Sequence, residues 1–423
     1  MNRNIQNIIL CLTGVLLLAG CSTYTPQPAN RNLNLSYLYN PSVSGFPVSV
    51  VGWHNSDKTT IIFCLLKKNE LTFYQEDSVK KAGIRIKYNL YNNNLLKISD
   101  SANVVLFLND NHHDTLVASF VVNTPDTISY MLDLTVSDIN RPTGRRIFYD
   151  IDRSRQVNTQ DFLMVNPQGA LYFSNIVQPT DTFMFKTRFP KKQWVWRKSY
   201  SSTDYPLPYP PHTLTVVKPF VFKPDSSFRF LCTDTSCFTL EKECMLHFHS
   251  DSTPYGGYSV YRYHEHFPET RSPYRMLQPL HYLTSNKEYN ELNLYAEKKN
   301  GVDKFWLEAA SSPDRARELI KVFYTRVAYA NRYFTSYTEG WKTDRGLLYV
   351  VLGLPNTIYK THNVERWIYG NSQSNSTLTF NFEKRNNPLC SNDFILNRNE
   401  SYKITWIQAL DAWRNGRIFS VGN

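Results

Sequence analysis

The chain has 423 residues and a formal net charge of +11, so it is long enough for two or three domains with sizeable cores. Hydrophobic content of 42% is that of a globular protein, and the high aromatic share of 14% favours β-rich domains. Lysines and arginines are spread rather than clustered, which argues against nucleic acid as a partner. The positive charge then indicates either attraction to anionic lipid or envelope polymer, or only a soluble basic surface.

The first residues follow the order of a secretory signal. Asn2-Arg3-Asn4 give a positive head, and Ile8 to Leu18 form an apolar run that is too short for a comfortable bilayer span. The small pair Ala19-Gly20 then precedes Cys21. This order resembles the bacterial lipoprotein signal, which implies removal of residues 1–20 and acylation of Cys21, with palmitate among the chains. An ordinary signal peptide or a transmembrane anchor is the alternative.

Residues 21–33 predict a lipidated, flexible tether. The segment is polar, contains two prolines and has no acidic residue, so we expect an extended chain. Ser22 after the cysteine resembles outer-membrane sorting, and the acidic cluster that directs some lipoproteins to the cell surface is not present in the sequence. We therefore expect an outer-membrane lipoprotein, on the periplasmic face rather than the cell surface.

Residues 34–155 predict an antiparallel β-sandwich of immunoglobulin-like size. Seven short segments rich in β-branched and aromatic residues alternate with turn clusters such as Asn92-Asn93-Asn94. The expected strands are Pro47 to Trp53, Thr59 to Leu66, Ile84 to Leu90, Val104 to Leu108, Thr115 to Val122, Thr127 to Leu134 and Arg146 to Ile151.

Residues 156–270 predict a second β-rich domain. The expected strands are Ala170 to Phe173, Asp181 to Arg188, Gln193 to Arg197, Thr213 to Phe222, Phe228 to Leu231 and Tyr258 to Tyr263. The prolines between Tyr205 and Pro211 predict an extended, exposed loop, either a connector or a ligand for a partner.

Five cysteines remain after Cys11 leaves with the signal and Cys21 is lipidated. Cys64 lies in a buried-strand pattern and is expected to be a core thiol. Cys232, Cys237 and Cys244 lie close together, so an oxidising periplasm would permit one disulfide among them, with the pairing left open. The fifth is Cys390, and the odd total predicts at least one free thiol.

Two His-x-His pairs raise a metal alternative. On strands, His247 with His249 and His264 with His266 would each point to one face, and adjoining strands would bring four imidazoles together near Cys244. The competing interpretation is exposed polar positions on sheet edges. We expect no metal and no cofactor, and keep these four residues only as a weaker alternative.

From about residue 271 the periodicity becomes helical. Ser285 to Glu288 is a capping box that opens a helix to about Lys299. Ser312-Pro313-Asp314 starts a second helix, whose apolar stripe runs to Phe334. The continuous apolar run Leu347 to Leu352 predicts a central strand buried on both faces. Further expected elements are strands at Arg366 to Tyr369 and Thr377 to Phe382, and a last helix with Ile404, Ile407, Leu410 and Trp413 closed by Gly416.

A five-residue motif, Gly340-Trp341-Lys342-Thr343-Asp344, follows the second helix. With Arg345, Gly346, Gly353 and Pro355 it resembles the GWxTD domain family of bacterial envelope proteins, over about residues 270–423. The family has no settled biochemical activity. Some lipoproteins of this build are associated with type IX protein secretion and gliding, so the resemblance implies partners in such an envelope complex.

Each motif residue also has a structural interpretation. Gly340 and Gly346 would give backbone freedom at the ends of a turn, and Trp341 would cover the seam between helix and sheet. Thr343 and Asp344 would bind backbone donors in the turn, and Arg345 would bind helical carbonyls or a carboxylate such as Glu365. The structural interpretation is favoured over a binding site.

The expected fold is multidomain and mainly β, with two antiparallel sandwich-like domains and a C-terminal α+β domain at residues 271–423. The sequence has none of the common hydrolase, phosphate-binding or dinucleotide motifs, so we expect no enzyme. The favoured function is a lipid-anchored scaffold or adaptor of an envelope machine. The alternatives are glycan or peptidoglycan binding through Trp194 and Trp196, which share a strand face, and a hydrolase with an unrecognised site that includes Asp344.

Overall fold

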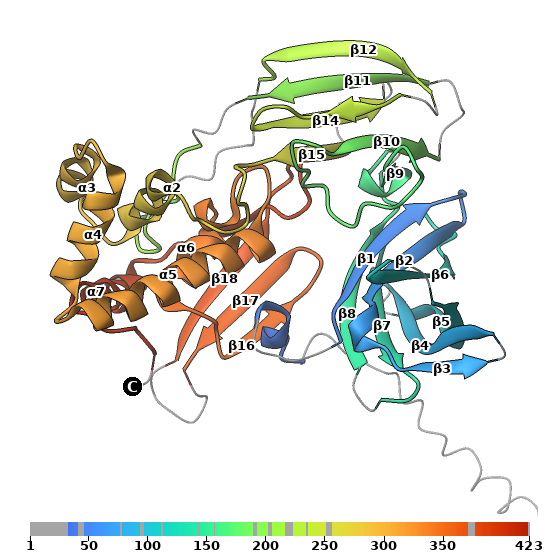
Figure 1. The fold of residues 1–423 in the computed structure, drawn as a ribbon, viewed down its shortest axis with the longest axis horizontal. Coiled ribbons are helices and arrows are strands. Elements are labelled where there is room, and N and C mark those ends of the chain that lie inside the picture. Colours follow the sequence, from blue (N-terminus) through green and yellow to red (C-terminus); the bar gives the residue numbers. More distant parts are fainter. Residues whose placement is uncertain are drawn as a thin grey trace, which may run out of the picture.

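A computed structural model describes residues 33–421 except 41–45, 77, 94–96, 111–112, 142–143, 156, 189–192, 202–204, 216–222, 234–235, 251–255 and 371–376. The predicted signal peptide, Cys21 and almost all of the tether lie outside the described residues. In the described part, no helix is both long and apolar enough to cross a bilayer. Figure 1 shows the helices at one end of the molecule, a β-sandwich at the other, and β11, β12 and β14 along the edge between them.

The first unit consists of two antiparallel sheets. One has the order β1-β2-β6, and the other has the order β3-β4-β7-β8 with β5 paired to β4. All seven predicted strands are confirmed, with one short strand more. Their bounds are β1 Val48–His54, β2 Thr59–Lys67, β3 Phe73–Glu76, β4 Val79–Asn92, β5 Lys97–Asn109, β6 Thr115–Asn123, β7 Ser129–Asp138 and β8 Gly144–Asp152.

Side-chain alternation explains this core. Along β2, Ile62, Cys64 and Leu66 point inward and are buried, so Cys64 is a core thiol as predicted. They pack with inward residues of β4 and β7, such as Ile84 and Leu132. Fully burying aliphatic side chains of this kind contributes about 1.5–3 kcal/mol each.

The second unit also has two sheets, with orders β13-β10-β9 and β12-β11-β14-β15. Their strands are β9 Phe162–Val165, β10 Thr182–Thr187, β11 Gln193–Tyr200, β12 Ser226–Cys232, β13 Phe238–Thr239, β14 Cys244–Ser250 and β15 Tyr258–Arg262. Phenylalanines fill the space between the sheets, and the rings of Phe185 and Phe248 meet edge to face with centroids 4.9 Å apart.

Two strand predictions in this unit need correction. Ala170 to Phe173 forms only an isolated bridge at Leu171, because the short segment leaves its pairing with β9 after one residue. In the segment Thr213 to Phe222, residues 213–215 are not a strand, and residues 216–222 lie outside the described residues. The buried strand β9 was missed, since its continuous apolar run Phe162–Val165 is too short to show a period.

The third unit packs helices on the antiparallel sheet β16-β17-β18-β19. Its helices are α2 Pro273–Leu277, α3 Asn286–Asn293, α4 Lys298–Ala309, α5 Pro313–Phe334, α6 Asp344–Leu352 and α7 Lys403–Arg414. Its strands are β16 Thr357–Lys360, β17 Val364–Tyr369, β18 Leu378–Lys384 and β19 Phe394–Leu396. The chain is therefore mainly β with a C-terminal region of helices and sheet, as predicted.

The helix starts in this unit follow the predicted capping chemistry. The Ser285 hydroxyl accepts from the Glu288 N–H while the Glu288 carboxylate accepts from the Ser285 N–H, so the capping box is confirmed. The helix it opens ends at Asn293, however, and α4 begins at Lys298. Ser312 caps α5 as predicted.

The predicted last helix is confirmed as α7, but the four residues that indicated it do not share one face. Residues three apart drift steadily around a helix with 3.6 residues per turn, so Ile404, Ile407, Leu410 and Trp413 cannot all face the core. Ile404 is 72% exposed, and the buried face consists of Trp406, Ala409 and Trp413. Gly416 closes the helix at a φ of 68°, as predicted.

The prediction of a central strand at Leu347 to Leu352 is wrong, because this run belongs to α6. Thr343 is the N-cap, with its Oγ1 accepting from the Gly346 N–H at 3.1 Å, and Asp344 lies in the first turn. Every residue of α6 is buried, so the sequence shows no amphipathic period and resembles a buried strand.

The segment before the first sandwich belongs structurally to the third unit. Leu35 and Tyr39 lie in the core of that unit, with Tyr39 at the end of the short 3-10 helix η1 Ser36–Tyr39. The Leu35 N–H donates to the Ile358 carbonyl at 2.8 Å, and the Asn34 amide donates to the Asn356 carbonyl at 2.9 Å. The start of the described chain therefore docks beside β16.

Polar contacts also join the units. Arg188 pairs with Asp57 of the first unit at 2.6 Å, and the Tyr261 hydroxyl of the second unit donates to the Leu389 carbonyl of the third at 2.9 Å. Arg155, just after β8, donates to the Asn386 side chain at 3.0 Å.

Candidate functional site

The Gly340–Asp344 motif connects α5 to α6 through the 3-10 turn η5 Gly340–Lys342. Both flanking glycines serve close approach, and neither has a positive φ. A Cβ at Gly346 would lie 1.9 Å from the Gly340 carbonyl oxygen, and one at Gly340 would lie 2.0 Å from the Ala330 carbonyl oxygen. The predicted role in backbone freedom is therefore corrected: the glycines let three backbone segments touch.

Trp341 is buried under the turn. Its indole N–H donates to the Glu339 carboxylate at 2.7 Å, and its carbonyl accepts from the Tyr282 hydroxyl at 2.8 Å. Lys342 pairs with Glu339 at 3.0 Å and places its ammonium 5.3 Å from the centre of the Trp341 ring. Burial opposes ionisation of Glu339, but Lys342 and the Trp341 N–H hold the pKa of Glu339 below its ordinary value.

Asp344 ties the motif to the far edge of the sheet. Its Oδ2 accepts from the Leu396 N–H at 2.8 Å, and its Oδ1 pairs with Arg398 at 2.5 Å. The carboxylate is thus bound by a backbone donor of β19 and by a guanidinium, which does not resemble a free general base.

Arg345 is almost fully buried between two aromatic rings, 4.4 Å from the centre of Phe394 and 5.1 Å from that of Phe334. Its Nη1 donates to Glu365 at 2.8 Å, so the predicted carboxylate partner is confirmed. Its Nη2 donates to the carbonyl and side-chain oxygens of Asn392 at 2.9 and 2.5 Å.

Glu365 carries the network on to the start of the described chain. The Tyr39 hydroxyl donates to Glu365 Oε1 at 2.5 Å. Burial raises the pKa of Glu365, but Lys360, Arg345 and the Tyr39 hydroxyl more than offset it and lower that pKa. Burial beside this carboxylate raises the pKa of Tyr39 to about 12. The carboxylate is therefore ionised and bound on both oxygens.

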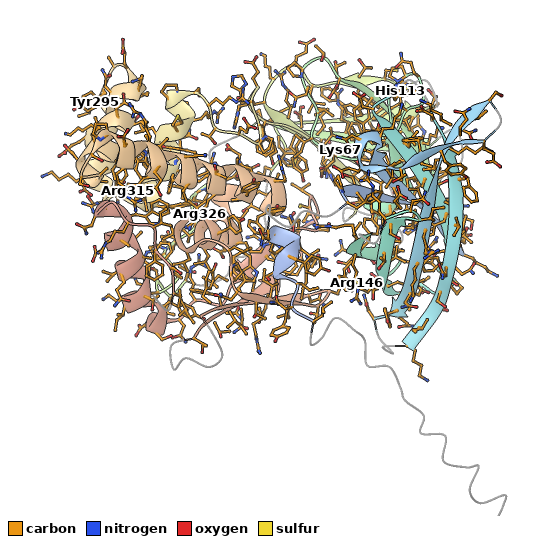
Figure 2. The ribbon with its side chains drawn as sticks, turned by 60° about the horizontal axis from the view of Figure 1, so that its bottom comes forward. Lys67, His113, Arg146, Tyr295, Arg315 and Arg326 are labelled. Atoms are coloured by element: carbon orange, nitrogen blue, oxygen red, sulfur yellow. The ribbon has the colours of Figure 1, made fainter. Side chains whose placement is uncertain are left out.

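The outer part of the motif stabilises the end of α6. Gly353 follows the helix with a φ of 87°, which favours glycine. Arg326, labelled on α5 in Figure 2, donates to the carbonyls of Val350 and Val351 at 3.3 and 3.2 Å. Burial lowers the pKa of Arg326 to about 10, so it stays charged and complements the negative end of the helix. Pro355 follows in the turn before β16.

The His-x-His pairs are placed differently from one another. His247 and His249 lie buried on β14 with ring centres 5.7 Å apart, whereas His264 and His266 follow β15 in a turn. The His247 ring nitrogens lie 2.8 Å from the Ser259 hydroxyl and 3.2 Å from the Gly256 carbonyl. Within the described ranges, no three His, Cys, Asp or Glu side chains are placed to share a metal ion.

Cys237 and Cys244 of the second unit have free thiols. Cys232 lies opposite Gln193 at one end of β11, while Cys244 precedes Met245, which lies opposite Tyr200 at the other end. Seven strand steps separate these levels, or about 23 Å. A disulfide needs Cα atoms within about 7 Å, so this pair cannot be bridged in this fold.

Sequence reasoning missed several partners of the motif. Tyr39, Glu339, Asn392 and Arg398 all bind motif side chains or their partners. Only Glu339, which directly precedes the motif, is near it in sequence. The other three lie far away in sequence, so no local pattern pointed to them.

The sequence model of the GWxTD domain family matches residues 244–415. The match includes the motif, α2 to α7 and the sheet β16 to β19, and it begins earlier than the resemblance at about residue 270, so that it takes in β14 and β15. No curated protein matches the chain.

Proposed function

We propose that this protein is a non-enzymatic scaffold or adaptor of a bacterial envelope machine. A lipid attached to Cys21 anchors it in the outer membrane, on the periplasmic face. Outer-membrane protein secretion of type IX is the leading candidate for that machine, through the resemblance stated above. The GWxTD domain supports an envelope protein but carries no known activity. The charged residues of the motif are engaged in internal contacts, which favours a structural role for them.

One observation carries the scaffold proposal: the outer face of the sheet β1-β2-β6 carries a group of apolar side chains, with Ser49 and Ser119 among them. Its register places Trp53, Ile61 and Val121 in one row across the sheet, and Leu65 beside Val117 in another. Val117 and Val121 on the edge strand β6 are 43% and 52% exposed, and the others are half-buried. An outward apolar face with an open edge strand is typical of protein interaction surfaces. We propose a protein partner of the envelope as its occupant.

The test places a charge on this face. Val117→Lys with Val121→Lys leaves the inward residues of β6 intact, so the melting temperature should stay close to that of the wild type. The matched control is Ile404→Lys, an equally conspicuous exposed aliphatic on α7 at the other end of the molecule. The measurement is the set of envelope proteins that co-purify with each variant after crosslinking in cells.

We expect the double variant to lose partners that the wild type and Ile404→Lys retain, and cells that carry it to secrete less. An unchanged set of partners would contradict the use of this face. If the face binds vesicles of anionic phospholipid instead and loses them on substitution, it is a membrane contact rather than a scaffold surface.

A second candidate is glycan binding on β11. Trp194 and Trp196 share a face as predicted, and Trp194 is 48% exposed. The Arg229 guanidinium lies 4.8 Å from the centre of the Trp194 ring, and Trp196 stacks on His249. A sugar would thus meet one exposed ring rather than two. Trp194→Ala should abolish binding to purified peptidoglycan if this candidate holds, and equal binding by the variant would reject it.

A further inference from the structure

A cavity of about 430 Å³ lies where the three units meet. Its walls come from the end of β8, from the turn between β16 and β17, and from the chain between β18 and β19, and Gly256 and Gly257 before β15 complete it. This volume falls in the range of small-molecule sites in proteins. None of the predicted site residues lines it, although Arg345 binds Asn392 and stacks on Phe394 in its wall.

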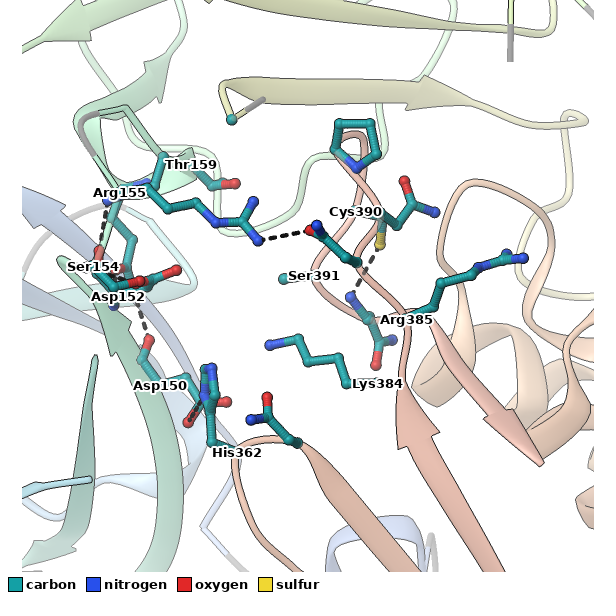
Figure 3. A pocket seen from close by; sticks show the side chains of 18 of the residues that line it. Asp150, Asp152, Ser154, Arg155, Thr159, His362, Lys384, Arg385, Cys390 and Ser391 are labelled. Carbon is teal, nitrogen blue, oxygen red and sulfur yellow. Dashed lines mark hydrogen bonds and ion pairs between the residues drawn. The ribbon is translucent and has the colours of Figure 1, made fainter. Parts of the chain in front are cut away.

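Lys384 extends from the end of β18 into the cavity, and Figure 3 shows its ammonium in the open space between the two walls. In the described part of the structure this ammonium has no hydrogen bond and no ion pair. Burial lowers the pKa of Lys384, while Asp150 and Asp152 act on it from a distance in the opposite sense. A half-buried cation without a direct partner is costly, so an anion placed beside it would be stabilised.

The other cations of the cavity have partners. Arg385 pairs with Asp393 at 2.7 Å, and Lys360 lies near Glu365 and over the Phe394 ring. Arg155 reaches across the opening from the rim to Asn386. Its guanidinium has further N–H groups beyond the one that donates to Asn386. Lys384 and Arg155 therefore supply donors for an anionic group near the mouth.

Among the described residues, the facing wall contains a hydrogen-bond acceptor without a donor, an oxygen of the Asp150 carboxylate. Asp150 Oδ1 is buried and accepts no hydrogen bond in the part of the chain that is described. His362 Nδ1 lies 3.5 Å from this oxygen, which makes an ion pair only when the histidine is protonated, and it is also buried without a hydrogen bond in the described residues. By contrast, Asp152 Oδ1 accepts from the hydroxyl and N–H of Ser154 at 2.6 and 2.9 Å. Asp150 therefore has one buried carboxylate oxygen that accepts no hydrogen bond from the described chain, and a ligand donor placed there would satisfy it.

We propose that this cavity binds a small molecule with a carboxylate and an amine, an amino acid or a short peptide, with the carboxylate at Lys384 and Arg155 and the amine at Asp150. The ligand satisfies both unmatched groups at once. Asp150 and Asp152 in the wall disfavour polyanions such as phosphate esters. The site is independent of the apolar face of β1-β2-β6, so it stands or falls separately from the scaffold proposal.

The test is calorimetric titration of the full chain in detergent with four probes: alanyl-alanine, N-acetylalanine, alaninamide and inorganic phosphate. Alanyl-alanine should bind best. Lys384→Gln should weaken its binding about tenfold or more, since a charge-assisted hydrogen bond is lost. Lys384→Arg should retain most of it. Asp150→Asn should weaken alanyl-alanine but leave N-acetylalanine unchanged, because only the former carries the amine.

Lys321→Gln on the exposed face of α5 is the matched control and should bind like the wild type. Melting curves of each variant check that its fold is intact. If Lys384→Gln does not fold, Lys384→Arg and Asp150→Asn still test the site. The proposal is overturned if no probe binds the folded wild type at about 10 mM, if Lys384→Gln binds alanyl-alanine like the wild type, or if phosphate binds as tightly as the dipeptide.

Discussion

At the residue scale, the buried pair of Arg345 and Glu365 determines how the motif is stabilised. Both side chains are removed from solvent, so the desolvation of two charges opposes their attraction. The additional hydrogen bonds to Asn392 and Tyr39 help to offset the desolvation of the two charges, since they satisfy a donor of Arg345 and an acceptor of Glu365 outside the ion pair. Replacing both residues by apolar ones should therefore change the free energy of unfolding little. Replacing only one of them leaves the other charge buried without its partner, which is strongly destabilising.

This asymmetry gives a prediction. Glu365→Gln should lower the free energy of unfolding by about 3–5 kcal/mol, because it strands the Arg345 charge. The double variant Arg345→Met with Glu365→Gln should recover part of that loss. Urea unfolding measures both. The control is Arg317→Met, which removes an exposed pair with Asp314 and should cost less than about 1 kcal/mol. Equal losses in the single and double variants would contradict the argument.

A second prediction concerns buried histidines and acid. Burial lowers the pKa of His247 to about 3, with His249 acting in the same sense, against 6.5 for an ordinary histidine. Below pH 6.5 the His247 ring takes up a proton in the unfolded chain, whereas the buried ring of the native state stays neutral down to about pH 3. The full contribution of neutral His247 is thus present above pH 6.5 and is lost as the pH falls toward 3, at about 1.4 kcal/mol per pH unit.

The comparison of His247→Gln with the wild type isolates this contribution, because the carboxylates titrate alike in both. Chemical unfolding between pH 7 and 4 should show a slope against pH that is shallower in the variant by about 1.4 kcal/mol per unit below pH 6. His54, whose pKa burial also lowers to about 3, remains in both proteins and keeps part of the slope. Parallel slopes in the two proteins would refute the assignment.

The pairing of Arg345 with Glu365 could be predicted from the sequence. Arg345 directly follows the motif, and Glu365 is a carboxylate only twenty residues further along the chain. Tyr39 and Asn392 were not predicted as their partners. Tyr39 lies more than three hundred residues before Glu365, and Asn392 lies in a loop without a period. The cavity residues Lys384 and Asp150 were missed for the same reason: they meet only when the three units assemble.

At the element scale, α6 shows why a helix of the third unit was predicted as a strand. A run of apolar residues buried all round has the same appearance in a helix and in a central strand. The useful signal lay outside the run. Thr343 as N-cap, Asp344 in the first turn and Gly353 after the last turn are helix boundaries. Thr and Asp also occur in turns, so the first two of these signals fit a turn equally well when the run after them is taken for a strand.

The contact between α6 and η5 yields a third prediction. Gly346→Ala should destabilise the protein by about 3 kcal/mol, since its Cβ would meet the Gly340 carbonyl at 1.9 Å and the backbone must separate. Helix propensity acts in the opposite direction, because alanine is favoured over glycine by about 1 kcal/mol. Thermal unfolding measures the net effect. The control is Gly169→Asn, at an open position with a φ of 85° that asparagine tolerates. A more stable Gly346→Ala would mean that the contact is not close.

At the scale of the whole molecule, alternation of side chains predicted every strand of the first sandwich except the short β3, because the other strands are long and most have one buried face. The second unit was predicted less well, since β9 and β13 are short and have no period. The order of units followed from the change of period near residue 271. How the units meet could not be predicted, because those contacts join residues from distant parts of the chain, such as Tyr261 with Leu389.

The docking of residues 33–39 on the third unit bears on the predicted anchor. Twelve residue steps separate Cys21 from Leu33, so a fully extended tether reaches about 40 Å. If Cys21 carries the lipid, the surface around η1 is the part held within that distance of the membrane. This surface includes both the third unit and β8 of the first sandwich, since the Arg145 guanidinium lies 5.8 Å from the centre of the Tyr37 ring. The sheet β1-β2-β6 belongs to the sandwich at the end of the molecule away from the helices.

Cys21→Ala tests the anchor on which this arrangement depends. Without the thiol no acyl chain can be attached, and a lipoprotein signal is then not cut at that position. The variant should leave the outer-membrane fraction of a density gradient and appear either soluble or, uncleaved, with the inner membrane through its apolar run. Its melting temperature should not change, because Leu35 and Tyr39 still dock on the third unit. Cys237→Ala, at an exposed free thiol, is the matched control and should fractionate like the wild type. A Cys21→Ala protein that stays with the outer membrane would mean that a protein contact, such as the apolar face, holds it there instead of a lipid.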